Sequence, residues 1–312
     1  MRKFRLVLAG PLATFSLVAA LGAALTGCGP AAVASSGRGS ILAVGAENEY
    51  ANVISQVGGR YVRVGAIMDN PNTDPHAFEA SPSVASVISS ARLVVQNGLG
   101  YDGFMQRIES ASRNPKRQVI DVQHLLGVPN SEPNPHLWYS PRTMPAVAGA
   151  VARALAHLAP AHAGYFEANA RRFDLALQPW YRAVAAFRRR YGGAAVATTE
   201  PVADYMLQGA GARILTPLSL QLAIMNGVDP APQNVSAQDA LFTGHRVKAF
   251  LYNRQVTDSI TQSFLRLAEA RHIPVVGVYE TLPPGFTYQG WMLAETRAVQ
   301  AAVASGRSTQ TL

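Results

Sequence analysis

From residue 41 onward, short runs of β-branched and other apolar residues alternate with segments whose apolar positions recur every three or four residues. The short runs are 41–46, 61–68, 92–97 and 118–122 in the first half, and 194–199, 213–217, 248–253 and 274–279 in the second. The helical segments between them are 47–57, 83–90, 102–112, 202–208, 237–243, 258–270 and 289–305. This alternation predicts βαβ units with a mostly parallel sheet in each half.

Two longer helical patterns, 143–158 and 161–191, lie between the halves and are separated by Pro160. Pro179 falls inside the second pattern and should kink or break it, because its ring removes a backbone donor. We therefore expect an α/β fold of two lobes, 41–160 and 192–312, joined by one long backbone helix. Such a helix would restrict the relative motion of the lobes.

The N-terminus has the layout of a secretory signal peptide. Three basic residues among the first five precede an apolar stretch from 6 to 25, which ends in Leu-Thr-Gly-Cys at 25–28. A transmembrane anchor is the alternative, since about 20 apolar residues could span a bilayer, but Pro11 and several glycines interrupt the stretch. We expect residues 1–27 to be a cleaved export signal.

The tetrapeptide at 25–28 resembles the bacterial lipobox, in which the cysteine is acylated and becomes the first residue after cleavage. This resemblance makes Cys28 the lipid attachment point and residues 28–40, rich in Gly, Ala and Ser, a flexible tether. Stable anchoring needs more than one acyl chain, which lipoprotein processing would supply.

Composition narrows the class of protein further. The chain has 312 residues, 48% hydrophobic and only 15% charged, which suits two globular units rather than a disordered chain. Its single cysteine excludes an internal disulfide. The net charge is +8, but loss of residues 1–27 would leave 24 basic against 19 acidic residues, a net charge of +5. We therefore expect no nucleic-acid partner.

Candidate ligands follow the carboxyl ends of four predicted strands, where open α/β sheets bind their ligands. His76 and His136 follow strands of the first half, and Glu200 and Glu280 end strands of the second. Imidazole and carboxylate together suit first-row divalent metals. His124 is the alternative candidate ligand if His136 does not bind the metal.

Each of these residues also has an ordinary structural interpretation. A single histidine after a proline can be a surface loop residue, and Glu200 could cap the helix that follows it. The remaining histidines, at 157, 162, 245 and 272, have no companion ligand nearby in the sequence, and we treat them as structural or solvated.

Three segments closely resemble the metal-binding lipoproteins of bacterial ABC importers, the zinc and manganese solute-binding family. They are 72–82 (Asn-Thr-Asp-Pro-His-Ala-Phe-Glu-Ala-Ser-Pro), 97–101 (Asn-Gly-Leu-Gly-Tyr) and 134–141 (Asn-Pro-His-Leu-Trp-Tyr-Ser-Pro). In sequence order the match covers nearly everything from 41 to 305. The resemblance implies two α/β lobes, each a four-stranded parallel sheet flanked by helices, joined by one long backbone helix with the metal between the lobes.

The resemblance also implies the ligand set. The first family histidine falls on His76 and the second on His136, and the third position, histidine or glutamate in the family, is Glu200. The fourth is usually aspartate and here is Glu280, a departure that places the backbone one methylene farther from the ion.

The expected cargo is Mn²⁺ or Zn²⁺. An oxygen ligand at the third position and the lack of a histidine-rich loop between His76 and His136 resemble the manganese-type members. Carboxylates favour Mn²⁺, whereas intrinsic affinity favours Zn²⁺. The family delivers its cargo to a permease powered by a cytoplasmic ATPase, so we expect a monomeric, exported binding protein and no enzyme.

Two other functions fit the same residues. A lipid-anchored metallohydrolase would use Glu47 or Glu79 as general base beside a metal-bound water, although no HExxH or nucleophile-elbow pattern occurs. A binder of a metal chelate or haem would need a wider cleft with arginines at its mouth.

Overall fold

The computed structural model describes residues 40–70, 72, 76 and 78–312. The predicted signal (1–27), Cys28 and the tether up to residue 39 lie outside the described residues. Within the described part of the chain, no helix is both long and apolar enough to cross a bilayer.

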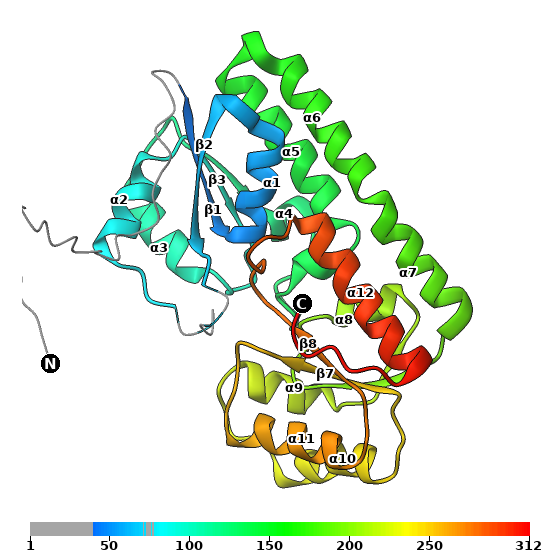
Figure 1. The fold of residues 1–312 in the computed structure, drawn as a ribbon. Helices are drawn as coiled ribbons and strands as arrows, with labels where there is room; N and C mark the ends of the chain where they lie inside the picture. Colours follow the sequence, from blue (N-terminus) through cyan, green and yellow to red (C-terminus); the bar gives the residue numbers. More distant parts are fainter. Residues whose placement is uncertain (1–39, 71, 73–75, 77) are drawn as a thin grey trace, which may run out of the picture. The chain divides into compact units, whose positions relative to one another are not determined.

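The first sheet contains four parallel strands in the order β2-β1-β3-β4. These strands are β1 (Ile41–Glu47), β2 (Val62–Met68), β3 (Leu93–Gln96) and β4 (Gln118–Asp121). Helices α2 (Pro82–Ser90) and α3 (Gly103–Ala111) cover one face, and α1 (Asn48–Gly58) covers the other together with α5 (Thr143–Leu158) (Figure 1). A short helix, α4 (Val122–Leu126), follows β4. The central strands β1 and β3 are mostly apolar and buried because both faces are covered, whereas the edge strands β2 and β4 are only partly buried.

The second sheet repeats this arrangement, with four parallel strands in the order β6-β5-β7-β8. They are β5 (Ala195–Thr198), β6 (Arg213–Ile214), β7 (Ala249–Asn253) and β8 (Val275–Val278). The helices are α8 (Asp204–Gly209), α9 (Leu218–Met225), α10 (Pro232–Thr243), α11 (Ser259–Ala270) and α12 (Tyr288–Ser305). The predicted fold class, two four-stranded parallel α/β lobes, is confirmed.

The main errors in the sequence-based elements concern short helices. Helices α4 and α9 were not predicted, and α10 begins at Pro232 rather than at residue 237. Six of the eight residues of α9 are apolar, so its sequence carries no helical period to detect. The predicted strand 213–217 shortens to two residues.

The predicted backbone helix is α6 (Ala163–Ala176) followed by α7 (Gln178–Tyr191). The interruption is at Leu177, two residues before Pro179, as expected of a proline inside a helical pattern. Figure 1 shows α7 continuing roughly along the direction of α6, and α12 packs along α7.

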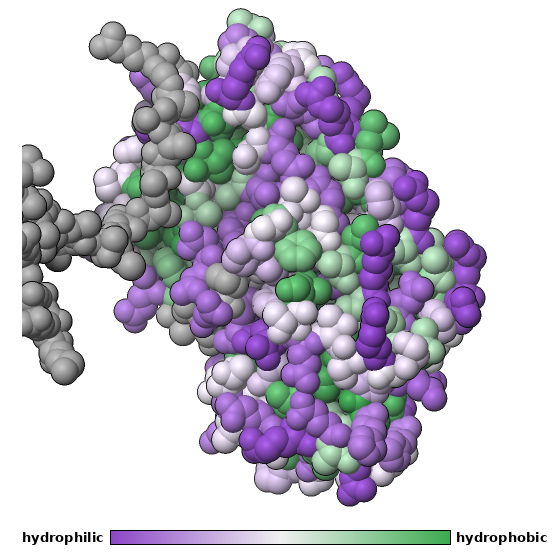
Figure 2. All heavy atoms as spheres, viewed as in Figure 1, coloured by the Kyte–Doolittle hydropathy of each residue, from purple (hydrophilic) through white to green (hydrophobic). Residues whose placement is uncertain are grey.

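One hydrophobic core runs through both sheets and the helices that join them. Its largest fully buried side chains include Trp138 of the first lobe, Trp180 of α7 and Trp291 of α12. A smaller cluster in the second lobe contains Phe242 and Phe264. On the face viewed in Figure 2, apolar residues occur in small groups between hydrophilic ones. Close packing shared by the two lobes opposes a large hinge motion.

Candidate metal-binding site

Three of the four predicted ligands meet between the lobes. His76 lies between β2 and α2, His136 lies just before a 3₁₀ turn (Leu137–Tyr139), and Glu280 comes two residues after β8. Their ligand atoms all lie within 4.8 Å of one another. The Nε2 atoms of His76 and His136 are each 3.2 Å from the Glu280 Oε2 atom.

The site is buried on one side and open on the other. His136 and Glu280 are fully buried, whereas the His76 side chain is 20% exposed. A pocket of about 420 Å³ borders His76 and Tyr101 and extends to α9 at Leu222 and Met225. Among the described residues that line this pocket there is no arginine.

Asn134 fixes the orientation and tautomer of His136. Its amide nitrogen donates to the carbonyl of Pro201 at 2.8 Å, so its amide oxygen faces the imidazole. That oxygen lies 2.8 Å from His136 Nδ1 and accepts the His136 backbone N–H at 3.0 Å. Because an amide oxygen can only accept, Nδ1 carries the hydrogen and Nε2 presents a lone pair to the site.

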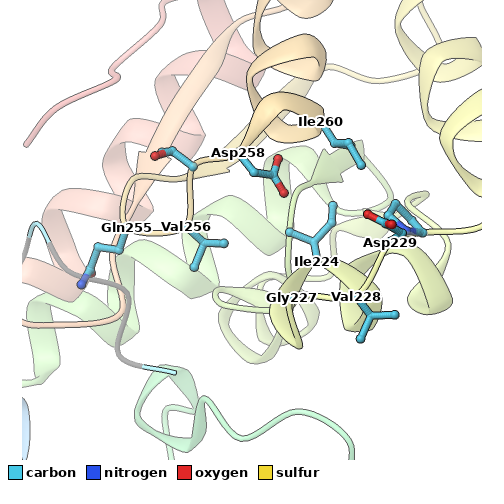
Figure 3. Close-up of a pocket in the computed structure, with 10 residues that line it drawn as sticks. Ile224, Gly227, Val228, Asp229, Gln255, Val256, Asp258 and Ile260 are labelled. Carbon is cyan, nitrogen blue, oxygen red and sulfur yellow. The ribbon is translucent and has the colours of Figure 1, made fainter. Parts of the chain in front are cut away.

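Glu280 is held by groups from both lobes. The Gln255 side-chain oxygen accepts the backbone N–H groups of Glu280 (2.6 Å) and Thr281 (3.0 Å), and Figure 3 shows Gln255 beside Val256 in the segment after β7. Asn253 donates to Glu280 Oε1 at 2.7 Å, and the Tyr101 hydroxyl donates to Oε2 at 3.0 Å. Glu280 is therefore held at its backbone N–H and at both carboxylate oxygens.

The charge states follow from burial and from these contacts. Burial lowers the pKa of His136, against the opposing effect of Glu280, so the imidazole is neutral at neutral pH. Burial would raise the pKa of Glu280, but the interaction with His136 and His76 outweighs it and brings the pKa below its usual value. A carboxylate and an imidazole lone pair thus face each other, an arrangement that a cation between them stabilises.

Glu200 lies next to this group but is not one of its three members. It is buried at the end of β5, and its Oε1 accepts a 3.0 Å hydrogen bond from the Asn253 side-chain nitrogen, which also donates to Glu280. The two carboxylates are therefore neighbours across one amide group.

The other candidates lie elsewhere. The His124 side chain is 81% exposed and is 3.2 Å from Asp121. Glu79 is exposed, and Glu47 is fully buried and outside the group of three.

Sequence reasoning missed Tyr101, Asn253 and Gln255. Asn253 is the last residue of β7, so the rule that located the ligands would have identified it if applied to every strand. Tyr101 lies in one of the family-like segments but had no assigned role.

The buried charged residues are all acidic in the described part of the chain. They are Glu47, Glu49, Asp102, Glu200, Asp204, Glu280 and Glu295, and no lysine or arginine is buried with them. Acidic residues are therefore the ones buried in the described interior, although the net charge of the whole chain is positive.

The chain matches known proteins over most of its length. Residues 44–302 match the family model of ZnuA, the periplasmic component A of a zinc-uptake complex. The manganese-binding lipoprotein MntA of Bacillus subtilis is 26% identical over 161 residues, 50% of this chain and 52% of that protein. The chain spans between about a third and about half of the length of the curated relatives that it matches.

Solved structures share the fold. The SBP FpvC of Pseudomonas aeruginosa, in complex with Mn²⁺, is similar with a TM-score of 0.70 at 20% identity, over 85% of this chain and 98% of that one. The periplasmic zinc-binding protein TroA of Treponema pallidum has a TM-score of 0.69 at 17% identity, over 86% and 100%. The family match extends over both sheets and all three residues that meet between them, and this chain belongs to the ZnuA family of periplasmic metal-uptake components.

Proposed function

We propose that the protein captures a divalent transition-metal ion outside the cytoplasmic membrane and delivers it to an ABC permease driven by a cytoplasmic ATPase. The observation that supports this most directly is the meeting of His76, His136 and Glu280, whose nitrogen and oxygen atoms come from both lobes and converge within 4.8 Å. Glu200 is the proposed fourth ligand. Its side chain would move a short distance away from Asn253 to reach the ion.

Manganese is the proposed physiological cargo, with zinc also bound tightly. Two imidazoles and two carboxylates form a mixed set, in which the oxygen ligands suit Mn²⁺ and the general affinity series favours Zn²⁺. The structural relative FpvC is described with both Mn²⁺ and Ni²⁺, which is consistent with a site of broad metal preference.

Binding rather than catalysis is the function that we propose. Neither carboxylate considered as a general base, Glu47 or Glu79, belongs to the group of three, and Glu280 has both oxygens engaged. The pocket beside His76 has none of the arginines expected for an anionic chelate or haem among its described lining residues.

Export and anchoring complete the proposal. Residues 1–27 would be removed on export, Cys28 would carry acyl chains, and the tether would hold a monomer at the outer face of the cytoplasmic membrane. The boundaries proposed for the folded part are a first lobe at 41–160, the linking helix at 161–191 and a second lobe at 192–312.

Capture would need only a small rearrangement. The core shared by the lobes opposes wide closure, and the backbone of Leu282 forms a hydrogen bond in each direction with Asn48 of α1, at 2.7 and 2.9 Å. Release is proposed to involve the Pro-Pro-Gly segment at 283–285 that follows this contact.

The test is metal analysis of protein purified without chelator, followed by calorimetric titration with Mn²⁺ and with Zn²⁺. We expect one ion per chain, and no stoichiometric binding after His76→Ala or His136→Ala, with circular dichroism unchanged. His124→Ala is the matched control and should bind normally, because its side chain is 81% exposed. A double His76→Ala, His136→Ala variant that retained one tightly bound ion would rule out this site.

A further inference from the structure

Glu295 is a buried carboxyl group in the middle of α12, apart from the proposed ligands. It is fully buried and has no ion-pair partner among the described residues. The Trp291 indole N–H donates to its Oε1 at 2.8 Å, and its Oε2 lies 2.7 Å from the hydroxyl oxygen of Tyr139. An ionised carboxylate in such a place would be costly.

The Tyr139 hydroxyl makes a second contact of the same length. Its oxygen is also 2.7 Å from the backbone carbonyl oxygen of Tyr279. Two short contacts between oxygens need two hydrogens, and the hydroxyl has one. The Tyr279 carbonyl can only accept, so the Tyr139 hydrogen is directed to it, and the hydrogen in the other contact must come from Glu295.

We infer that Glu295 is a protonated carboxylic acid at neutral pH, and that its O–H holds Tyr139 against the Tyr279 carbonyl as a link between the two lobes. Tyr139 comes three residues after His136, and Tyr279 immediately precedes Glu280. The link therefore joins the two segments that carry buried ligand candidates. Glu295 is in this sense a positioning residue, and its effect on metal binding rests on the proposed function.

The surroundings of Glu295 agree with a neutral acid. Burial raises the pKa of Glu295 to about 8, against its contacts with Tyr139, Trp291 and the backbone of Tyr279, which favour the carboxylate. The titratable groups that interact with it are Tyr139 in the first lobe's 3₁₀ turn and Tyr288 on α12. These two tyrosines in turn interact with Glu280 after β8, Glu49 on α1 and Tyr181 on α7. Arg182 is exposed on the outer side, where it lines a groove with Arg297.

The pH dependence of folding provides the first test. A carboxyl group whose pKa is raised on folding stabilises the folded state at low pH, and this contribution is lost as pH rises toward about 8. Glu295→Gln keeps a donor toward Tyr139 and an acceptor for Trp291 but cannot ionise. The quantity to compare is the folding equilibrium constant of the wild type divided by that of Glu295→Gln. We expect this ratio to fall by up to about tenfold per pH unit between pH 5 and about 8, and then to level off.

A matched control removes a different carboxylate. Glu269 is exposed on α11 and accepts a hydrogen bond from Gln310, so Glu269→Gln should change no pH profile in this range. Infrared difference spectroscopy gives an independent measurement, and a carboxylic-acid band at pH 7 should be absent from Glu295→Gln. A pH-independent ratio of folding constants, or the absence of that band from the wild type, would overturn the inference.

Metal titration separates this inference from the proposed function. Tyr139→Phe removes the hydroxyl that joins Glu295 to Tyr279, and we expect its affinity for Mn²⁺ to fall about tenfold while Glu295→Gln keeps the wild-type affinity at pH 7. If no variant and no wild-type protein binds metal, the proposed function fails while the folding and infrared results still decide the state of Glu295. Equal affinity of Tyr139→Phe and wild type would show that the link does not position the ligands.

Discussion

Asn134 orients His136, a proposed metal ligand, through its side-chain amide. Its oxygen accepts from both Nδ1 and the backbone N–H of His136, and its nitrogen donates to Pro201, the residue after Glu200. A hydrogen bond to the distal nitrogen of an imidazole fixes the ring and raises its basicity toward a metal. The Asn134 amide thus connects a proposed ligand of the first lobe, His136, with the segment of the second lobe that carries Glu200.

Replacing Asn134 by Ala should therefore weaken metal binding without abolishing it. We expect a loss of about 10–100-fold in affinity for Mn²⁺ or Zn²⁺, measured by competition with a metal-sensitive dye. Asn234→Ala on α10, where the amide nitrogen donates to the exposed Ser219 hydroxyl at 2.8 Å, is the matched control. Unchanged affinity in Asn134→Ala would mean that His136 keeps its orientation without the Asn134 amide.

Glu280 illustrates how a longer side chain is accommodated. The resemblance to the family suggested an aspartate here, and the extra methylene of glutamate requires the backbone to sit farther from the ion. Gln255 holds that backbone by accepting the N–H groups of both Glu280 and Thr281. The carboxylate then reaches to within 3.2 Å of both histidines.

At the scale of elements, the segment between β7 and α11 supports the site. Asn253 ends β7, Gln255 follows it, and Asp258 begins α11 with a capping box in which its carboxylate accepts from the Thr261 N–H at 2.7 Å. Asp258 and Asp229 also line a pocket of about 370 Å³ beside this segment (Figure 3). The helix cap and the two amide side chains that contact Glu280 thus lie within one short segment.

Asp258→Ala tests how far the cap supports the site. Loss of an N-cap carboxylate should lower the free energy of unfolding by about 1 kcal/mol in urea titrations. We expect metal affinity to stay within about twofold of wild type, because Asn253 and Gln255 keep their own hydrogen bonds. A much larger drop in affinity would instead indicate that the cap positions Glu280 through Gln255.

At the scale of the whole molecule, the shared core makes the two lobes one cooperative structure. Trp180 of α7 donates a 3.0 Å hydrogen bond to Thr296 of α12, and both side chains are buried in the region that joins the sheets. A metal that binds residues of both lobes should therefore stabilise the entire fold.

We expect Mn²⁺ at 100 times its dissociation constant to raise the free energy of unfolding by about 2.7 kcal/mol, measured by thermal or urea denaturation. The His76→Ala, His136→Ala double variant should show no such increase. Tryptophan fluorescence and circular dichroism should follow one common transition. Two separated transitions would contradict the single core.

Acidification should remove this stabilisation, because protons compete with the metal for imidazole nitrogen. Burial lowers the pKa of His136, so this residue stays neutral at pH values where an ordinary histidine is already charged. The metal-dependent increase should therefore persist through the ordinary titration range of histidine and decline at lower pH, measured as the metal-induced shift in unfolding midpoint. A loss centred at or above the ordinary pKa of histidine would contradict this assignment for His136.

The sequence by itself predicted the eight strands and four candidate ligands, and the structure brings three of these ligands together between the sheets. Alternating runs locate buried parallel strands, and ligands collect at their carboxyl ends, so position along the chain made His76, His136, Glu200 and Glu280 candidates. Only the tertiary structure decided the groups that hold them. Tyr101 contacts Glu280 across 179 positions and Tyr139 contacts Glu295 across 156, and such contacts depend on how the lobes pack. The proton on Glu295 belongs to this second class, because it follows from burial and from counting hydrogens at one shared hydroxyl.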